Sequence, residues 1–507
     1  VYSNMNLPPK SPFFARARRP TIRRKASELA EFTAHAHLGQ RISDLVGGVF
    51  LANALTGIGV LTVPYAFQES GWLLGTLVLV VCMLMAFITG TYVIEAEAIV
   101  NALHYGDGVS DLVEGFLAET QQECIDQHVD PSHAKEYFTG AIIKRNVDSS
   151  FKIRDRFEVA EMGELLLTNV VAIKLVYLAI VLFIYGSLSA FVVTVNTSLA
   201  NTLVQASKWT HQGLKTIDEL YPWCLVVTFI IAFKLCLGDV QKTKIFTVVV
   251  MIVRFVAMVF MMSAALQTVM EEKIDFHDAV IDMPQWNTEK FNLVFGNCVY
   301  VFSLHHCLPS MIAPLKHQGD SPCVLFTAFA MVVVLMVILS VTAMLAYGAN
   351  VQPFYNQNFE HVSWLHGSIG LYILAYPTLA ISTMPASAIT LRNTIGKLLG
   401  AKPPDPDGPV TLTTTLLTAG VLLPPFGMAY ITRDITVILK YTGGYFGLTV
   451  SYALPLVLVI YGRRRLSTMT NPASFTWGLK SPFGNYATYA VVLLFYALAL
   501  GRNIFLT

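Results

Sequence analysis

Apolar residues occur in eleven long runs along the chain, separated by shorter polar segments. A helix needs about 20 predominantly apolar residues to cross a hydrocarbon core about 30 Å thick, and each run approaches or exceeds that length. The runs predict eleven transmembrane helices, at residues 44–68, 72–98, 170–204, 222–238, 245–267, 291–314, 323–347, 366–391, 410–431, 434–461 and 486–505. Composition agrees, because 54% of the residues are hydrophobic and only 13% are charged. The sequence therefore predicts an all-α polytopic protein of the lipid bilayer.

Two of these runs are interrupted by residues that break helices. The first contains NALTGIGVLTVP at residues 53–64, where two glycines free the backbone and Pro64 removes a backbone donor. The sixth contains SLHHCLP at residues 303–309. Non-helical backbone at membrane depth is tolerated only where it is buried in protein or lines a polar cavity. Two breaks five runs apart predict a five-plus-five inverted repeat with a shared binding site at the middle of the bilayer.

Several stretches resemble the amino acid/auxin permease family, which belongs to the larger amino acid, polyamine and organocation transporter group. NALTGIGVLTVPYAFQESGW is similar to the first-span signature of the family. Four further stretches look like a divergent branch of it: GDVQKTK (238–244), FGNCVYVFSLHHCLPSMIAP (295–314), AISTMPASAITLRN (380–393) and YTGGYFGLTVSYALP (441–455). The resemblance implies a LeuT-like fold with broken helices 1 and 6. It also implies a secondary active transporter of amino acids, coupled to H+ or Na+ and without a cofactor.

The resemblance further implies where the substrate and the coupling ion bind. The two breaks would hold the substrate through Thr56, Gly57, Ile58, Gly59, Ser303, Leu304 and His305. The hydroxyls of Ser382 and Thr383 would be available to sodium, together with first-span carbonyls. His305 and His306 can titrate near physiological pH, which makes them candidates for proton coupling. A neutral histidine that bridges the freed backbone by a hydrogen bond is the alternative.

Basic residues in the polar segments predict the orientation in the membrane. Lys and Arg favour cytoplasmic loops. If the predicted spans alternate in direction, most of the Lys and Arg residues lie on one side of the membrane, together with the tail (1–43) and the 101–169 insert. We expect a transporter domain over 44–505, a cytoplasmic N-terminus and an extracellular or lumenal C-terminus. Plasma membrane and endolysosome both fit this pattern.

Several charged residues lie within or close to the predicted spans. Arg254 is about 14 Å deep in the fifth run, so we expect it to face the bundle and to form a gating or structural ion pair, or to contact a substrate carboxylate. Asp239 and Lys242, in the turn after the fourth run, could latch one conformation of a transporter. Glu95 and Glu97, at the end of the second run, are interpreted as interfacial anchors.

The 101–169 insert predicts amphipathic helices near 110–125, 131–145 and 157–168 but carries no catalytic signature. No enzyme, metal site or nucleic-acid partner is indicated, since the net charge is +1 and the cysteines lack ligand spacing. The insert or the basic tail could bind a cytosolic partner. An amino-acid sensor that signals through these segments without net flux is therefore the alternative function.

Overall fold

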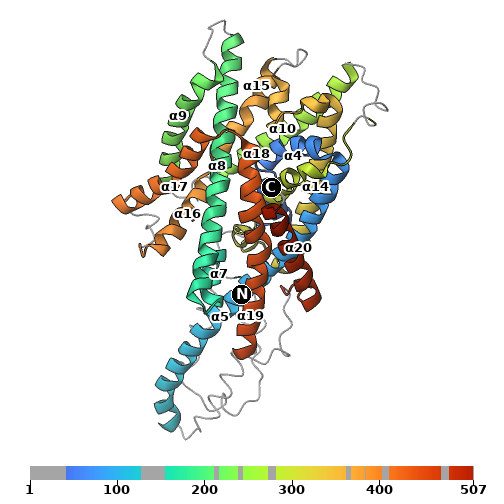
Figure 1. Ribbon diagram of the computed structural model, residues 1–507. Coiled ribbons are helices and arrows are strands. Elements are labelled where there is room, and N and C mark those ends of the chain that lie inside the picture. Colours follow the sequence, from blue (N-terminus) through green and yellow to red (C-terminus); the bar gives the residue numbers. More distant parts are fainter. Residues whose placement is uncertain are drawn as a thin grey trace.

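The computed structural model describes residues 42–126, 153, 155–209, 216–237, 244–271, 281, 283–360, 367–382, 384–401, 410–469 and 479–505. Helices form almost all of the regular structure in these ranges, and Figure 1 shows them gathered around the long helix α8 (Val170–Trp209). Within this part of the chain, 8 helices are long and apolar enough to cross a membrane, and a bent pair makes a possible ninth. The prediction of an all-α polytopic membrane protein is confirmed.

The unbroken helices follow the predicted apolar runs. They are α5 (Trp72–Asp126), α9 (Ile217–Leu237), α10 (Lys244–Glu271), α14 (Ser321–Tyr347), α17 (Leu412–Ile431) and α20 (Tyr486–Phe505), besides α8. In Figure 1, α9, α16 and α17 lie on one side of α8, and α4, α14 and α20 lie on the other.

Both breaks predicted from the sequence are present. The first run forms α3 (Asp44–Leu55) and α4 (Gly59–Ser70), which meet at an angle of 55°. The sixth run forms α12 (Phe291–Phe302) and the short helix α13 (Leu308–Ile312), separated by the non-helical residues of SLHHCLP.

Two further runs depart from a regular helix, which the sequence analysis did not anticipate. The eighth run forms α15 (Gly367–Ala375), the 3-10 turn η6 (Tyr376–Ser382) and α16 (Met384–Leu398). Pro377 explains this change, because proline lacks a backbone N–H and disfavours helical geometry in the residue before it. The tenth run forms α18 (Ile435–Tyr441), the π-helical turns η7 (Thr442–Gly447) and η8 (Thr449–Ala453), and α19 (Leu454–Met469).

The segment between the second and third runs is more helical than expected. Helix α5 continues without interruption to Asp126, well beyond the predicted end of the span at residue 98. The sequence from 101 to 126 contains no proline that would stop it. The expected helix at 110–125 is therefore part of α5, the one at 157–168 corresponds to α7 (Val159–Leu166), and the one at 131–145 lies outside the described residues.

Candidate functional site

The first break begins at Thr56, which caps the end of α3. Thr56 is fully buried, and both its backbone N–H and its hydroxyl donate to the carbonyl of Ala52 at 2.9 Å. Helix α4 then restarts at Gly59, where Ile58 offers no capping side chain. The first N–H groups of a helix have no partner within that helix, and its N-terminus carries a partial positive charge. The break therefore presents amide donors suited to a carboxylate.

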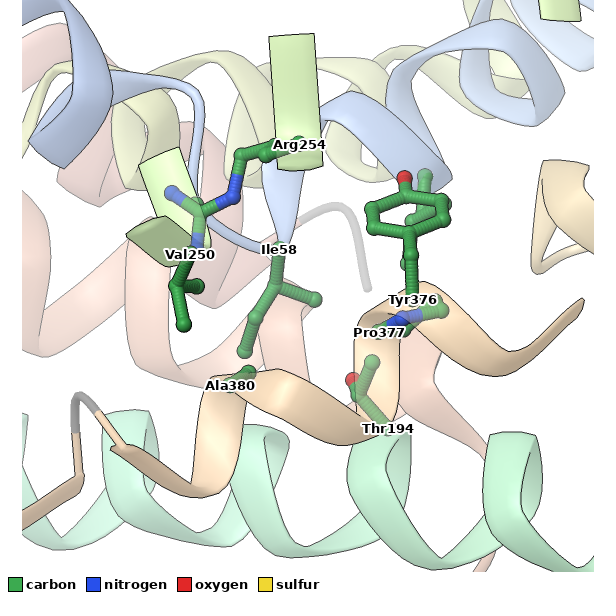
Figure 2. A pocket seen from close by; sticks show the side chains of 9 residues that line it. Ile58, Thr194, Val250, Arg254, Tyr376, Pro377 and Ala380 are labelled. Carbon is green, nitrogen blue, oxygen red and sulfur yellow. The ribbon is translucent and has the colours of Figure 1, made fainter. Parts of the chain in front are cut away.

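A small cavity of about 20 Å³ lies against this break. Four elements line it: the break and the start of α4 (Gly57, Ile58, Leu61), α8 (Thr194), α10 (Val250, Arg254) and η6 (Tyr376, Pro377, Ala380). Figure 2 shows Ile58 between the α10 side chains and the η6 turn, with Thr194 on the neighbouring α8. A cavity of this size holds about one water molecule. A ligand larger than a water molecule therefore needs the lining elements to move apart before it can bind.

Arg254 is the charged group of this cavity. Its side chain is buried, and Nη1 donates to both the backbone carbonyl of Asn53 at 2.8 Å and the Asn53 Oδ1 at 2.9 Å. Both acceptors belong to the last turn of α3, where the helix dipole is negative. The fifth run thus anchors the end of the first half-helix, a contact between residues 201 positions apart.

The second break packs against α5. His305 Nε2 lies 3.1 Å from the carbonyl of Ala86 and 3.0 Å from Thr89 Oγ1. A carbonyl can only accept, so Nε2 carries the proton, and the Thr89 hydroxyl is free to accept because it donates to Met85 O. In a neutral imidazole Nδ1 is then an acceptor, and it is buried without a hydrogen-bond partner among the described residues.

The remaining side chains of the second break contact other elements. The Ser303 hydroxyl donates to Val299 O at 2.6 Å and accepts from the hydroxyl of Ser451 at 3.0 Å. His306 packs its ring edge-on against Phe183 of α8, with ring centroids 5.2 Å apart. The contact with Ser451 links the break to η8, and the contact with Phe183 links it to α8.

The two broken runs touch one another, but only the first break lines the cavity. A Cβ added at Gly59 would lie 2.5 Å from Val301 Cγ2 on α12, so the start of α4 sits directly on the sixth run. Of the seven predicted substrate residues, Gly57 and Ile58 line the cavity; the others do not: Thr56, Gly59, Ser303, Leu304 and His305.

The ion-coupling candidates are placed only in part. Ser382 is the last residue of η6, the turn that lines the cavity. Its side chain and the whole of Thr383 lie outside the described residues. Asp239 and Lys242 also lie outside them.

Some residues that line the cavity could not be predicted from the sequence. Thr194, Val250 and Tyr376 come from three different runs, and only the Tyr-Pro pair at 376–377 marks a local irregularity.

The interpretation of Glu95 and Glu97 as interfacial anchors is wrong, because both side chains are completely buried. Arg463 of α19 donates two hydrogen bonds to the Glu95 carboxylate, from Nε at 2.6 Å and from Nη2 at 2.7 Å. The Ser481 N–H donates to the same carboxylate at 2.9 Å. The bidentate pair joins α5 to α19, and the bond from Ser481 joins α5 to the segment before α20. Sequence alone could not show it, since the partners are 368 residues apart.

One group among the described residues could offer ligands to a metal ion. Candidate ligand atoms of Asp44, His317 and Asp320 lie within 4.8 Å of one another. Asp44 Oδ2 is already 2.8 Å from His317 Nδ1, and the backbone of Ile42 pairs with Pro314 and Lys316 beside them. These contacts join the start of α3 to the segment after α13. We therefore interpret the group as a structural contact between these two segments.

Comparison with known proteins identifies the family. A family model described as "Transmembrane amino acid transporter protein" matches residues 40–499. The chain belongs to this family. The resemblance found in the sequence is thereby confirmed, and the transmembrane amino acid transporter family consists of membrane transporters rather than enzymes.

Curated relatives point to one branch of the transmembrane amino acid transporter family. The chain is 27% identical over 454 residues to transmembrane protein 104 of Homo sapiens, a match that covers 84% of this chain and 88% of the relative. The transmembrane protein 104 homolog of Dictyostelium discoideum is 25% identical over 495 residues, with coverages of 90% and 95%. This branch agrees with the four stretches that extend the first-span signature.

Among solved structures, the fold is similar to that of MhsT in complex with L-phenylalanine. The TM-score is 0.55, and the match covers 91% of this chain and 99% of that one at 10% identity. Identity this low supports a common fold and no more. The fold is therefore LeuT-like, with an interrupted first span.

Proposed function

We propose that this protein is a secondary active transporter of amino acids, and that access to the cavity at the first break alternates between the two sides of the membrane. The observation that carries the proposal is the cavity itself, where α8, α10 and η6 converge on non-helical backbone beside a buried guanidinium. Membership of the transmembrane amino acid transporter family supports it. We also propose the finer architecture: eleven spans, ten of them in two inverted repeats, with the N-terminus in the cytoplasm.

The chemistry of the break suits a carboxylate. Amide groups at the start of α4 and the Arg254 guanidinium both favour a negatively charged group. The rest of the lining is mostly apolar, with Ile58, Leu61 and Val250 around the cavity. This combination favours a neutral amino acid over a charged one.

The position of Arg254 favours protons over sodium as the coupling ion. In related architectures sodium is coordinated by carbonyls at the end of a half-helix. Here the Asn53 carbonyl accepts from Arg254, and the Ala52 carbonyl accepts from Thr56. A fixed positive charge at this point repels a second cation, so we propose that coupling uses H+, with the free Nδ1 of His305 as one candidate acceptor.

Uptake into proteoliposomes tests this proposal. The purified protein is reconstituted, a mixture of labelled amino acids is supplied outside, and inward proton and sodium gradients are imposed separately. We expect saturable uptake that follows the proton gradient and does not need sodium. Uptake driven by sodium alone would contradict the assignment of the coupling ion, and the absence of both uptake and exchange would contradict transport.

Arg254→Lys tests the site within the same assay. Lysine keeps the charge, but its side chain is shorter, so its Nζ cannot occupy the position from which Arg254 Nη1 donates to both Asn53 oxygens. The expected result is a folded protein with a raised KM, whereas Arg502→Lys, outside the cavity on α20, should transport like the wild type. Equal kinetics for the two variants would remove Arg254 from the binding site.

A further inference from the structure

Glu97 of α5 is a buried carboxylate without an ion-pair partner in the part of the chain that the structure describes. Its side chain is 0% exposed, and neither Oε1 nor Oε2 has a hydrogen-bond partner among the described residues. Arg156 and the backbone N–H of Phe157 interact with it electrostatically, without an ion pair or hydrogen bond of normal length. An ionised carboxylate in such a place costs several kcal/mol.

The contrast with Glu95 shows that this is a property of the site. Glu95 lies two residues earlier, is equally buried, and receives a bidentate guanidinium and a backbone N–H. Residues two apart on a helix face nearly opposite directions. The same stretch of α5 therefore holds one carboxylate that is paired with a guanidinium and one that has no ion-pair or hydrogen-bond partner among the described residues.

Glu97 lies on the face of α5 that supports the second break. It follows Ala86, whose carbonyl contacts His305, by about three helical turns, or about 16 Å. Gly90 lies on the same face between them, and a Cβ there would be 3.9 Å from His305 Nε2 and 3.7 Å from a methyl group of Leu308. Movement of α13 along α5 therefore changes the surroundings of this face.

Residues 153 and 155–158 connect the turn of α5 that follows Glu97 to the end of the second break. Asn101 of α5 exchanges two hydrogen bonds with the backbone of Asp155, at 2.9 and 3.0 Å. Gln318, just after α13, exchanges two more with the backbone of Ile153, at 3.0 and 2.8 Å. The exposed Arg156 belongs to this segment, where its Nη2 lies 3.4 Å from Glu158 Oε1, and it interacts electrostatically with Glu97. A shift of α13 relative to α5 therefore displaces a positive charge that acts on Glu97.

We propose that Glu97 is a proton-binding site of the transport cycle, protonated in the present conformation and deprotonated when residues 155–158 move. The proposal rests on the proposed proton-coupled transport. On release, the O–H bond of the Glu97 carboxyl breaks and the proton passes to water, which leaves a carboxylate that Arg156 can pair with. The proton is thus exchanged at one end of the bundle, while the substrate binds at the first break.

Other charged groups around α5 have partners of their own. Arg463 pairs with Glu95, Glu161 with Lys397, Glu164 with Tyr177, and Glu69 with Lys290. Glu158, outside the spans, has its pKa raised by burial and by the neighbouring Glu161. The second break adds His305, His306 and Cys307, and Cys307 also interacts electrostatically with Arg156. None of these groups supplies a compensating charge to Glu97.

Infrared difference spectroscopy on the reconstituted protein tests protonation directly. The spectrum at neutral pH should contain the C=O stretching band of a protonated carboxylic acid, and this band should be missing in Glu97→Gln. Glu164→Gln, an exposed carboxylate of α7, serves as the matched control and should keep the band. If Glu97→Gln does not fold, Glu97→Asp should shift the band. A band that is absent from the wild type, or unaffected by these substitutions, overturns the proposal.

Transport assays test the coupling role. With one proton per substrate, a pH gradient of one unit supports about tenfold accumulation in the wild type. Glu97→Gln should keep exchange of labelled for unlabelled amino acid at equal pH but lose accumulation, whereas Glu164→Gln should keep both. Continued accumulation by Glu97→Gln overturns the proposal. Loss of exchange and accumulation in the wild type itself refutes transport, and the infrared band then decides whether Glu97 is a proton site.

Discussion

Replacing Gly59 by alanine should disturb the contact between the two broken runs in a calculable way. The added Cβ would lie 2.5 Å from Val301 Cγ2, whereas carbon atoms at optimal separation are about 3.5–4.0 Å apart. The helices must therefore separate by roughly 1 Å. Val301 cannot rotate away, because it is buried in α12 and a β-branched side chain in a helix has one strongly preferred χ1 rotamer. Overpacking of this kind costs about 1–3 kcal/mol.

A second substitution should relieve this strain. Val301→Ala removes the clashing methyl group, and the next contact of the added carbon, with Val301 Cβ, is an ordinary 3.6 Å. Gly59→Ala should therefore cost about 1–3 kcal/mol in the wild type and little in the Val301→Ala background. Thermal unfolding of the wild type, both single variants and the double variant in detergent measures this coupling.

The control and the refuting result are both defined by the structure. Gly427→Ala in α17 adds a carbon that meets nothing within 4 Å, so it should not lower stability. If the two effects at the contact add within about 0.5 kcal/mol, as for independent sites, the start of α4 does not sit on α12. The reasoning that packs the two broken runs against each other would then fail.

Two further predictions concern charge pairs of different burial. Arg463→Met leaves the buried Glu95 carboxylate unpaired, so it should lower the free energy of unfolding by about 3–5 kcal/mol; a melting temperature equal to that of the wild type would contradict the buried pair. Lys397→Gln removes a more exposed ion pair with Glu161, so the same melting experiment should show a change of about 1 kcal/mol or less.

The sequence predicted the elements whose signal is local. Long apolar runs predicted the spans, and glycine and proline within them predicted the interruptions between Leu55 and Gly59 and between Phe302 and Leu308. The break at Tyr376 was missed, although Pro377 was visible, because a proline within a span is compatible with a kinked helix as well as a broken one.

The features that depended on long-range contacts could not be predicted. Arg254 was expected to have a partner, but nothing in the sequence indicated Asn53, since the contact requires α10 to pack against the end of α3. The burial of Glu95 and Glu97 was missed for the same reason: a residue near the end of an apolar run looks interfacial until another element covers it.

Uptake by Gly57→Ala is the most direct test of the cavity as the amino-acid site. Gly57 lines the cavity, and an added Cβ meets only the carbonyl of Ala54 at 3.5 Å, so the fold should tolerate it. We predict that proton-driven uptake falls sharply or shows a raised KM in Gly57→Ala, while Gly427→Ala transports like the wild type. Wild-type uptake kinetics in a correctly inserted Gly57→Ala protein would contradict the assignment.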